Sequence, residues 1–294
     1  MKFEMVEQLV CRELDLVTCC DTLNVSRSGY YLWKKRSPSQ RKIGNDKLIQ
    51  LIAKIHAESR HTYGAPRIFQ KLKSAGETCG KKKVARLMKK QGLQGVAVKK
   101  YRVKTTDSDH DLPIADRVFK TETAAEQVTR PNQFWASDIT YIQTDEGWVF
   151  LAIFLDLFTR KVVGLSMEDN MRTELILNAL QMALGRQKII PDHELVGHSD
   201  RGSQYAAEAY RRCLESKGIT ASMSRRANCY DNAFAESFFH TLKVELVHRR
   251  NFKTRKEAMA AIFEYIEVWY NRQRIHSSLG YKTPMEYELT ALAA

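Results

Sequence analysis

The sequence predicts an α/β protein in which a mixed five-stranded sheet with helices on both faces follows a small all-helical part. Three observations predict this. Five strand-like runs, the later ones alternating with helical segments, occupy residues 124–290, whereas residues 44–90 show only helical periodicity. The chain has 294 residues, which is room for two domains. Its whole net charge of +13 lies in residues 1–115, so the two parts also differ in charge.

This uneven charge indicates the kind of partner. Residues 1–115 contain 24 Lys and Arg against 11 Asp and Glu, whereas residues 116–294 contain 23 of each. A basic part joined to a neutral globular part is typical of a protein whose arm binds a polyanion, and nucleic acid is the leading candidate. A basic face that only increases solubility is the alternative on charge alone.

Residues 1–43 are predicted to form an N-terminal helical segment with a cluster of aromatic and basic side chains. The cluster runs from Tyr30 to Arg36 and ends at Ser37-Pro38-Ser39. Tyr and Trp beside Lys and Arg can stack on DNA or clamp it. A small helical packing unit explains the same composition equally well, and both interpretations stay open.

Residues 44–105 are predicted to form a helix-turn-helix-like DNA-binding domain. Apolar residues keep a helical period from Asp46 to Glu58, Pro66 opens a second helix, and a third runs from Lys81 to Lys90. Three short helices with a basic third one fit a unit whose last helix enters the major groove. Lysines contact phosphates, so we expect this unit to position DNA; a charged outer face on a small bundle is the alternative. Its predicted DNA contacts are Arg67, Lys81, Lys82, Lys83, Arg86, Lys89 and Lys90.

A linker is predicted at residues 106–123, after the basic and then acidic segment 99–111, and the second domain at residues 124–290. Strands are expected at 138–143, 148–155, 161–167, 194–199 and 219–224. Helices are expected at 173–186, 206–217, 231–246 and 255–271. The near-continuous apolar run 148–155 is typical of a strand buried on both faces.

Cysteine usage and hydropathy predict a cytoplasmic chain without a membrane anchor. The six cysteines form no C-x-x-C pair and no Cys/His spacing typical of zinc, and no signal peptide is recognisable. Such a pattern indicates reduced thiols. The longest wholly apolar run, from Trp148 to Leu155, is too short to cross a bilayer.

Three carboxylates of the second domain stand where a carboxylate is locally out of place. Asp138 opens a β-branched run, Asp200 closes a short apolar segment, and Glu236 lies in a helix made mostly of Ala and Phe. Acids in such places are costly unless they are paired with cations or metal. Oxygen-only ligands suit Mg²⁺ or Mn²⁺, and two such ions about 3.5–4 Å apart can serve phosphodiester chemistry. Ordinary solvated acids or helix caps are the alternative for any one of them.

Five groups of residues together resemble the DDE transposases of bacterial insertion sequences, specifically their second-reading-frame catalytic product, and more distantly the retroviral integrases. The groups are Tyr63-Gly64 with Pro66-Arg67-Ile68; Trp135 with Asp138-Ile139-Thr140-Tyr141; His198 to Tyr205; Ser222 to Arg225 with Asp231-Asn232-Ala233 and Glu236 to Phe239; and Tyr270 to His276 with Leu279-Gly280-Tyr281 and Thr283-Pro284. The 35 residues between Asp200 and Glu236 match the family's spacing. The resemblance covers residues 43–288.

The resemblance implies an RNase H-like fold with Asp138 on the central strand, Asp200 after the fourth strand and Glu236 on a facing helix. These three acids would be the catalytic residues and the ligands of two Mg²⁺ or Mn²⁺ ions. Lys243 matches the family's basic residue two helical turns after Glu236 and is expected to touch a DNA phosphate. His240, one turn after Glu236, faces the same way; it either takes part directly or supports the site.

The chain departs from the family pattern in two places, where Gly197 replaces a common histidine and Ala227 a common glycine. Neither touches the three acids. The family often makes its full-length enzyme by frameshift fusion to an upstream product with end-recognition and multimerisation elements, so that product is an expected partner. Because such enzymes act on paired ends, a homo-oligomer, at least a dimer, is expected as well.

The expected function is DNA transposition. Water would cut DNA at a transposon end, and the 3′-hydroxyl released would attack a second phosphodiester in target DNA, without a covalent protein–DNA intermediate. Two alternatives share part of the evidence. An RNase H-like nuclease would use the same acids only for hydrolysis, and a non-enzymatic DNA-binding regulator would need only the helical domain.

Overall fold

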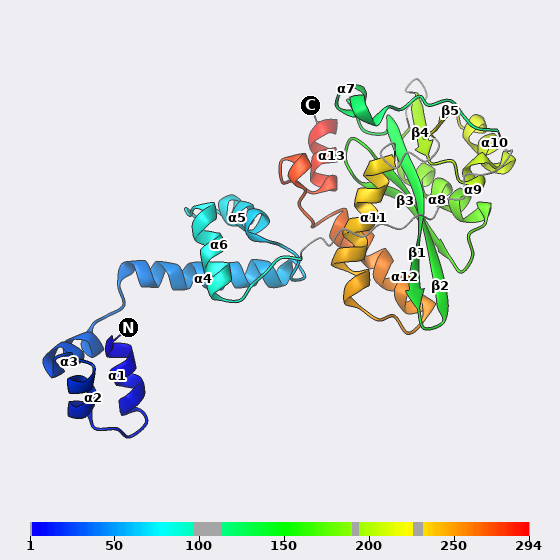
Figure 1. Cartoon of the computed structure of the whole chain (residues 1–294). Coiled ribbons are helices and arrows are strands. Elements are labelled where there is room, and N and C mark those ends of the chain that lie inside the picture. Colours follow the sequence, from blue (N-terminus) through cyan, green and yellow to red (C-terminus); the bar gives the residue numbers. More distant parts are fainter. Residues whose placement is uncertain (1, 97–112, 190–193, 226–231, 294) are drawn as a thin grey trace.

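The computed structural model describes residues 2–96, 113–189, 194–225 and 232–293. Figure 1 shows three bodies in chain order: a small bundle of α1, α2 and α3, a second helical group of α4, α5 and α6, and a sheet domain that contains the remaining elements. The segment 99–111 and Ala227 lie outside the described residues. Where the domains begin and end therefore stays a prediction.

The N-terminal body consists of α1 (Lys2–Val10), α2 (Leu16–Thr22) and α3 (Arg27–Lys35). Asp15 caps α2 by accepting a hydrogen bond from the Thr18 amide (2.9 Å), and Ser26 caps α3 in the same way through the Gly29 amide (3.1 Å). The small core of this body includes Val6, Cys19, Cys20 and Tyr30. The expected short helices are therefore present.

The second helical group consists of α4 (Gln40–Glu58), α5 (Ala65–Ser74) and α6 (Lys81–Lys90). The bounds of α6 match the prediction. α4 begins at Gln40 instead of Asp46, because Ser39 caps it through the Lys42 amide (3.2 Å). Gly92 follows α6 with a φ of +66°, the left-handed conformation that ends helices.

The sheet domain is built on five strands in the order β3-β2-β1-β4-β5. The strands are β1 (Phe134–Thr144), β2 (Gly147–Asp156), β3 (Val162–Glu168), β4 (Leu195–Ser199) and β5 (Ile219–Met223). β1, β2 and β3 form an antiparallel meander, whereas β4 pairs in parallel with β1, and β5 with β4. This is the mixed sheet that the sequence predicts, with β1 at its centre.

Helices cover both faces of the sheet. α8 (Thr173–Arg186), α9 (Ser203–Ala206) and α10 (Glu208–Ser216) share one apolar core with Trp135, Phe154 and Leu195. α11 (Ala233–Glu245) and α12 (Arg255–Glu264) share the other with Ile142, Leu151 and Ile153. Gly164 in β3 allows α8 to lie very close, since a Cβ there would come within 2.2 Å of the Ala179 carbonyl oxygen.

The helices differ from the sequence prediction in three places. The helix expected at 206–217 is divided at Ala207 into α9 and α10. The helix expected at 255–271 becomes a π-helix at Tyr265–Tyr270. α13 (Pro284–Leu292), which begins with a capping box between Thr283 and Glu286, was not predicted. Short helical turns complete the domain at Thr121–Thr123, Ala124–Gln127 (α7), Val247–Arg249 and Ser277–Leu279.

No helix within the described residues combines the length and the apolar character that a bilayer crossing requires.

Candidate active site and DNA-binding surface

Asp138 and Asp200 lie on neighbouring parallel segments at the centre of the sheet. β1 and β4 pair in register, with Ala136 opposite His198. Asp138 and Asp200 each follow two residues beyond this last pair, and the charge of Asp200 acts on Asp138, so the two acids lie near each other. Asp138 lies within β1, whereas Asp200 comes directly after β4. Because adjacent strands are about 4.8 Å apart, the two carboxylates start from neighbouring backbone positions.

Glu236 is carried to the same region by α11. It lies in the first turn of this helix, which packs on β1 and β2. Asn232, the N-cap residue, donates a hydrogen bond from Nδ2 to the carbonyl oxygen of Ser137 (3.1 Å). Ser137 directly precedes Asp138, and Asn232 stands one helical turn before Glu236. This bond therefore ties the start of α11 to the strand that carries Asp138.

The three carboxylates influence one another's protonation. Burial and then the charge of Asp200, with a smaller effect from Glu236, raise the pKa of Asp138 well above its usual value, although the Ile139 amide donates to it (2.8 Å). Burial and the charge of Asp200 raise the pKa of Glu236. Burial raises the pKa of Tyr205 as well, and the charges of Asp138 and Asp200 add to this effect. The acids thus share one electrostatic environment.

Lys243 is a cation near this group of acids. It lies in the last turn of α11, two helical turns after Glu236, with its Nζ 5.3 Å from the centre of the Tyr141 ring. Burial lowers the pKa of Lys243, and the charge of Asp138 opposes that effect. The lysine is therefore on the face of α11 that points toward the acids, as the spacing predicts.

Two buried polar atoms on α11 have no hydrogen-bond partner among the described residues: Nε2 of His240 and Oδ1 of Asn232. Such atoms are rare in folded proteins, because each costs the desolvation of a polar group. Their position beside Glu236 is what a site that expects substrate or solvent would show. Whether His240 takes part directly or supports the site stays a prediction.

The chemistry of the donors fits hard divalent cations. Within the described ranges, no three Asp, Glu, His or Cys side chains are already gathered as a ready-made metal site. Asp138, Asp200 and Glu236 nevertheless offer only carboxylate oxygens, the ligands that Mg²⁺ and Mn²⁺ prefer. Burial, followed by the charge of Asp200, raises the pKa of Asp138 and of Glu236, and a bound divalent cation would oppose both effects by favouring the ionised carboxylates.

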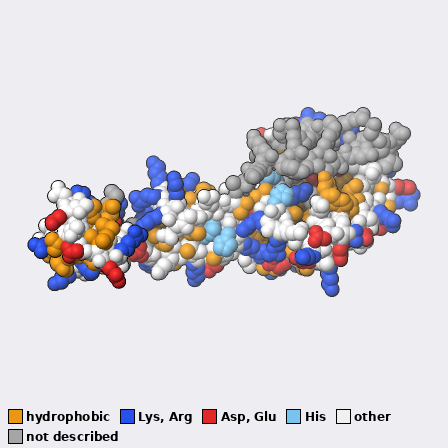
Figure 2. Space-filling view, turned by 60° about the horizontal axis from the view of Figure 1, so that its bottom comes forward, with side chains coloured by type: hydrophobic (Ala, Val, Ile, Leu, Met, Phe, Trp, Pro, Cys, Tyr) orange, Lys and Arg blue, Asp and Glu red, His pale blue; other side chains and the backbone are white. Residues whose placement is uncertain are grey.

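The predicted basic surface of α6 faces solvent. Val84, Leu87 and Met88 are buried against the rest of the helical group. The side chains of Lys81, Lys82, Arg86, Lys89 and Lys90 are exposed, and that of Lys83 is half-buried. Figure 2 shows Lys and Arg side chains projecting from this middle body. The helix thus has the amphipathic arrangement that the sequence predicts, while its contacts with DNA stay predictions.

Arg67, the other predicted DNA contact of this group, lies at the interface with the sheet domain. Its Nη1 is 3.8 Å from Oε1 of Glu245, at the end of α11. Burial, followed by the charge of Arg274, lowers the pKa of Arg67. Glu245 in turn receives hydrogen bonds from Arg274 (2.8 and 3.0 Å) and from the Tyr265 hydroxyl (2.9 Å). A contact of Arg67 with DNA stays a prediction.

Tyr63 and Arg60 hold the same interface together. The Ile275 amide donates to the Tyr63 hydroxyl (2.8 Å), and the Tyr63 ring packs on Trp269. Arg60 forms a bidentate pair with Glu264 (2.5 and 2.9 Å). Tyr63 and Arg60 therefore join the helical group to the part of the sheet domain that follows α11, while Arg67 contacts Glu245 at the end of α11. We refer to Arg60, Tyr63, Arg67, Glu245, Glu264 and Arg274 as the interdomain joint.

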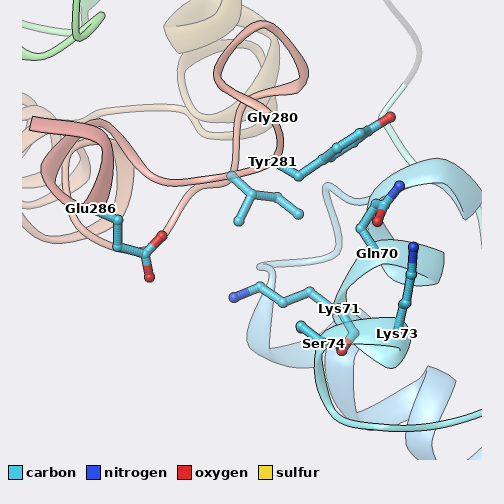
Figure 3. A pocket seen from close by; sticks show the side chains of 8 residues that line it. Gln70, Lys71, Lys73, Ser74, Gly280, Tyr281 and Glu286 are labelled. Carbon is cyan, nitrogen blue, oxygen red and sulfur yellow. Dashed lines mark hydrogen bonds between the residues drawn. The ribbon is translucent and has the colours of Figure 1, made fainter. Parts of the chain in front are cut away.

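A cavity of about 410 Å³ borders this joint. Figure 3 shows Gln70, Lys71 and Lys73 of α5 on one side of it, and Tyr281 and Glu286 on the other. None of the three acids lines this cavity.

Three family models match the chain. An HTH-like domain matches residues 44–101, and two models of an integrase core domain match residues 128–229 and 236–292. The 31 kDa protein of insertion element IS600 from Shigella sonnei is 44% identical over 268 residues, which is 91% of this chain and 96% of that protein. The transposase InsF of insertion sequence IS3A from Escherichia coli (strain K12) is 38% identical and covers 100% of both chains.

Solved structures similar to this chain include the catalytic core domain of HTLV-2 integrase in complex with magnesium, at 16% identity and a TM-score of 0.40, covering 55% of this chain and 99% of that one. The class of protein follows from the family matches and the order of the strands: an integrase-core protein of RNase H-like fold, preceded by a helix-turn-helix-like domain. The chain belongs to the DDE transposases of bacterial insertion sequences, the family that includes the IS3 transposase. The resemblance seen in the sequence is thereby confirmed.

Some residues of the site were not recognised as such from the sequence. Asn232 stands in a quoted motif, but only its hydrogen bond to β1 gives it a role. Glu245 was not singled out, because its partners Arg67 and Arg274 are remote in sequence. Arg67 and Arg274 both belong to the motifs described above, and no acidic partner was predicted for either. These two basic residues were the only signal that a buried acid was needed.

Proposed function

We propose that this transposase cuts DNA at the ends of its insertion sequence and joins them to target DNA with Asp138, Asp200 and Glu236 as catalytic residues. One observation carries this assignment. The charges of Asp200 and Glu236 both act on the buried Asp138, which supports a site shared by the three acids. Polynucleotidyl transfer is the activity of the integrase-core family to which the chain belongs.

The three carboxylates would hold two Mg²⁺ or Mn²⁺ ions. When bound, such ions assist phosphodiester chemistry by activating the attacking oxygen and stabilising the leaving one. The chain's own contribution is to fix the ligands: the Gly202 amide donates to Oδ1 of Asp200 (2.9 Å), and the Ile139 amide to Oδ1 of Asp138 (2.8 Å).

Lys243 would orient the DNA strand to be cut. Its ammonium group lies near Asp138 on the same helical face as Glu236, where a phosphate next to the scissile bond would meet it. Because the lysine is half-buried, a contact with phosphate would be stronger than one in open solvent. The exposed basic side chains of α6 would hold the duplex further from the cut.

The enzyme is also proposed to act as a homo-oligomer on paired transposon ends, together with the upstream-frame product of its element. Joining two ends to one target requires two sites that act together, and one chain contains one group of the three acids. DNA at the element's ends and target DNA are the expected partners.

A cleavage assay on duplex DNA that carries the element's own ends tests this proposal. With Mg²⁺ or Mn²⁺ the wild-type chain should nick the end and release a 3′-hydroxyl, and without the metal it should not. Asp138→Asn should bind the same duplex but leave it uncut. Nicking by Asp138→Asn at the wild-type rate would overturn the assignment, and an uncut wild-type substrate would favour a DNA-binding regulator.

A second assay separates the transferase from a nuclease that only hydrolyses. A duplex with a preprocessed 3′-hydroxyl end is incubated with target DNA, Mn²⁺ and the wild-type chain. A transferase gives joined products of defined length, whereas an RNase H-like nuclease gives only shorter fragments.

A further inference from the structure

The first 36 residues contain a helix–turn–helix arrangement of their own. α2 ends at Thr22, α3 begins at Arg27, and the four residues from Leu23 to Ser26 form the turn between them. Asn24 in this turn has a φ of +50°, and the Val25 amide donates to the Cys20 carbonyl oxygen (3.0 Å), so the chain reverses tightly after α2. A short turn of this kind between two helices is the defining feature of the motif.

A third helix supports this pair as the motif requires. α1 packs on both α2 and α3, and the core between them includes Val6, Cys19, Cys20 and Tyr30, each at most 5% exposed. The ring of Trp33 packs against Phe3 of α1 from the far end of α3. The order of the elements is that of a DNA-binding unit, with α3 in the place of the helix that enters the major groove.

The outer face of α3 carries side chains that suit duplex DNA. Arg27, Ser28, Tyr31 and Lys35 are all exposed, and Tyr31 is 52% exposed despite its aromatic ring. Residues 22–45 contain six basic residues and no Asp or Glu. Lys34 is paired with Glu7 (3.2 Å), whereas Arg27 and Lys35 form no ion pair with any described residue. Uncompensated basic groups beside an exposed tyrosine are typical of contacts with phosphate and base edges.

The position of this unit allows it to reach the same duplex as α6. Figure 1 shows α1, α2 and α3 at one end of α4, with α5 and α6 packed further along that helix. α4 has 19 residues. A helix of that length is about 28 Å long, comparable to the repeat of about 34 Å between successive major grooves. Two units attached to different parts of this helix can contact different segments of one DNA molecule.

We propose that residues 1–36 form a second helix-turn-helix unit, in which α3 binds the major groove of duplex DNA next to the segment held by α6. The inference extends the proposed function, because it adds a binding site that the integrase core and the HTH-like domain at residues 44–101 do not provide. The larger contact would lengthen the stretch of the transposon end that one protomer recognises.

The test compares two variants of the full-length chain on a labelled duplex of the element's own end. Arg27→Ala/Lys35→Ala removes two charges from the outer face of α3, and Lys2→Ala/Arg12→Ala removes two exposed charges from the α1 side of the same body. The α3 variant should lose protection from nuclease over about one helical turn of DNA and bind about tenfold more weakly, with its salt dependence reduced by up to about 0.9 for each phosphate that it no longer neutralises. The control variant should keep the wild-type footprint.

A wild-type footprint and affinity for the α3 variant would overturn the inference. An equal loss in both variants would overturn it as well, because net charge alone would then explain the effect. Ser28→Asp, which leaves the buried core untouched, provides a second variant and should weaken binding by placing a negative charge against the duplex. Thermal unfolding of each variant shows whether it is folded.

Cleavage of a short duplex separates this inference from the proposed function. Nicking of such a duplex by the wild-type chain tests the proposed function alone, whereas the footprint tests the role of α3. If the wild-type chain fails to nick any duplex with metal present, the proposed function fails, while the footprint still decides the role of α3.

Discussion

The two ends of α11 hold acids in opposite surroundings. At its start, burial of the carboxyl group and then the charge of the neighbouring Asp200 raise the pKa of Glu236. At its end, Glu245 is only 6% exposed, and although burial alone would raise its pKa, Arg274 and the Tyr265 hydroxyl hold it below its usual value. One acid lies among other acids, and the other lies among cations and hydrogen-bond donors.

The difference teaches how to separate a reactive acid from a structural one. The charge of Glu245 is balanced within the protein by Arg274, and its oxygens accept hydrogen bonds from Arg274 and Tyr265, so this acid stabilises the fold. Asp138 and Glu236 instead have other acids as neighbours, and the Ile139 amide and the charge of Lys243 only partly offset the effects that raise the pKa of Asp138. Acids that lie close to other acids at the centre of a sheet therefore point to chemistry, and acids balanced by cations at an interface point to architecture.

The largest expected difference between the two ends is in activity. Glu236→Gln should reduce DNA cleavage and joining by at least about 10⁴-fold, equivalent to more than about 5 kcal/mol of activation free energy, because the catalytic ions are deprived of a ligand. DNA binding and thermal stability should stay close to wild type. Rates of end cleavage under single-turnover conditions provide the measurement, and retention of a tenth of the wild-type rate would contradict the comparison.

The next effect is on stability, at the other end of the helix. Glu245→Gln leaves Arg274 buried without its counter-ion, and breaking a buried pair in this way costs about 3–5 kcal/mol. Denaturant unfolding measures the loss. Glu264→Gln, at the half-exposed partner of Arg60, is the matched control and should cost less than about 1 kcal/mol. Equal losses of unfolding free energy in the two variants would show that the buried Glu245–Arg274 pair contributes no more to stability than the exposed Arg60–Glu264 pair.

A smaller effect is expected on DNA binding when the exposed basic face of α6 is neutralised. Replacement of Lys82, Lys83, Arg86, Lys89 and Lys90 by Gln should weaken binding by about 100-fold and lower the salt slope by up to about 0.9 for each phosphate that the helix no longer neutralises. The free energy of unfolding should change little, since these side chains point away from the core. An unchanged salt slope in binding titrations at several salt concentrations would show that these α6 side chains do not contact DNA phosphates.

The smallest effect concerns pH and comes from His276, which contacts Arg274 of the interdomain joint. Burial, followed by the charges of Arg274, Arg67 and Arg160, lowers the pKa of His276 from 6.5 to about 2. The unfolded chain therefore takes up a proton below pH 6.5 that the folded chain refuses, so stability is present above that pH and is lost as the pH falls. Between about pH 7 and pH 5 the loss should be on the order of 1–2 kcal/mol. Unfolding at both pH values measures it, and His276→Gln should lose less; an equal loss would assign the dependence to other groups.

The sequence predicted the elements well where local rules decide them. The bounds of α6 and α8 are as expected, because an apolar period of about 3.6 residues and clear end signals define both. The π-helix at Tyr265–Tyr270 was missed, since its apolar pattern is that of an α-helix. β1 begins at Phe134, before the expected 138, because an aromatic pair that can sit in a loop instead packs into the sheet.

The site was only partly predictable for the same reason. Three misplaced carboxylates and a family resemblance located Asp138, Asp200 and Glu236, since each signal is local to a few residues. The tie between Asn232 and Ser137, and the joint between Arg67 and Glu245, depend on segments far apart in the chain. A single sequence shows that such residues are polar but gives no sign of which partner they meet.

The central claim is that residues 138, 200 and 236 come together to hold divalent cations, and thermal unfolding with Mn²⁺ tests it without reference to activity. Binding to the folded state at about 100 times the dissociation constant should stabilise the wild-type chain by about 2.7 kcal/mol. The triple variant Asp138→Asn/Asp200→Asn/Glu236→Gln should be at least as stable as wild type without metal, because the repulsion among the acids is gone, and should gain nothing from Mn²⁺. The same stabilisation by Mn²⁺ in both chains would contradict the account.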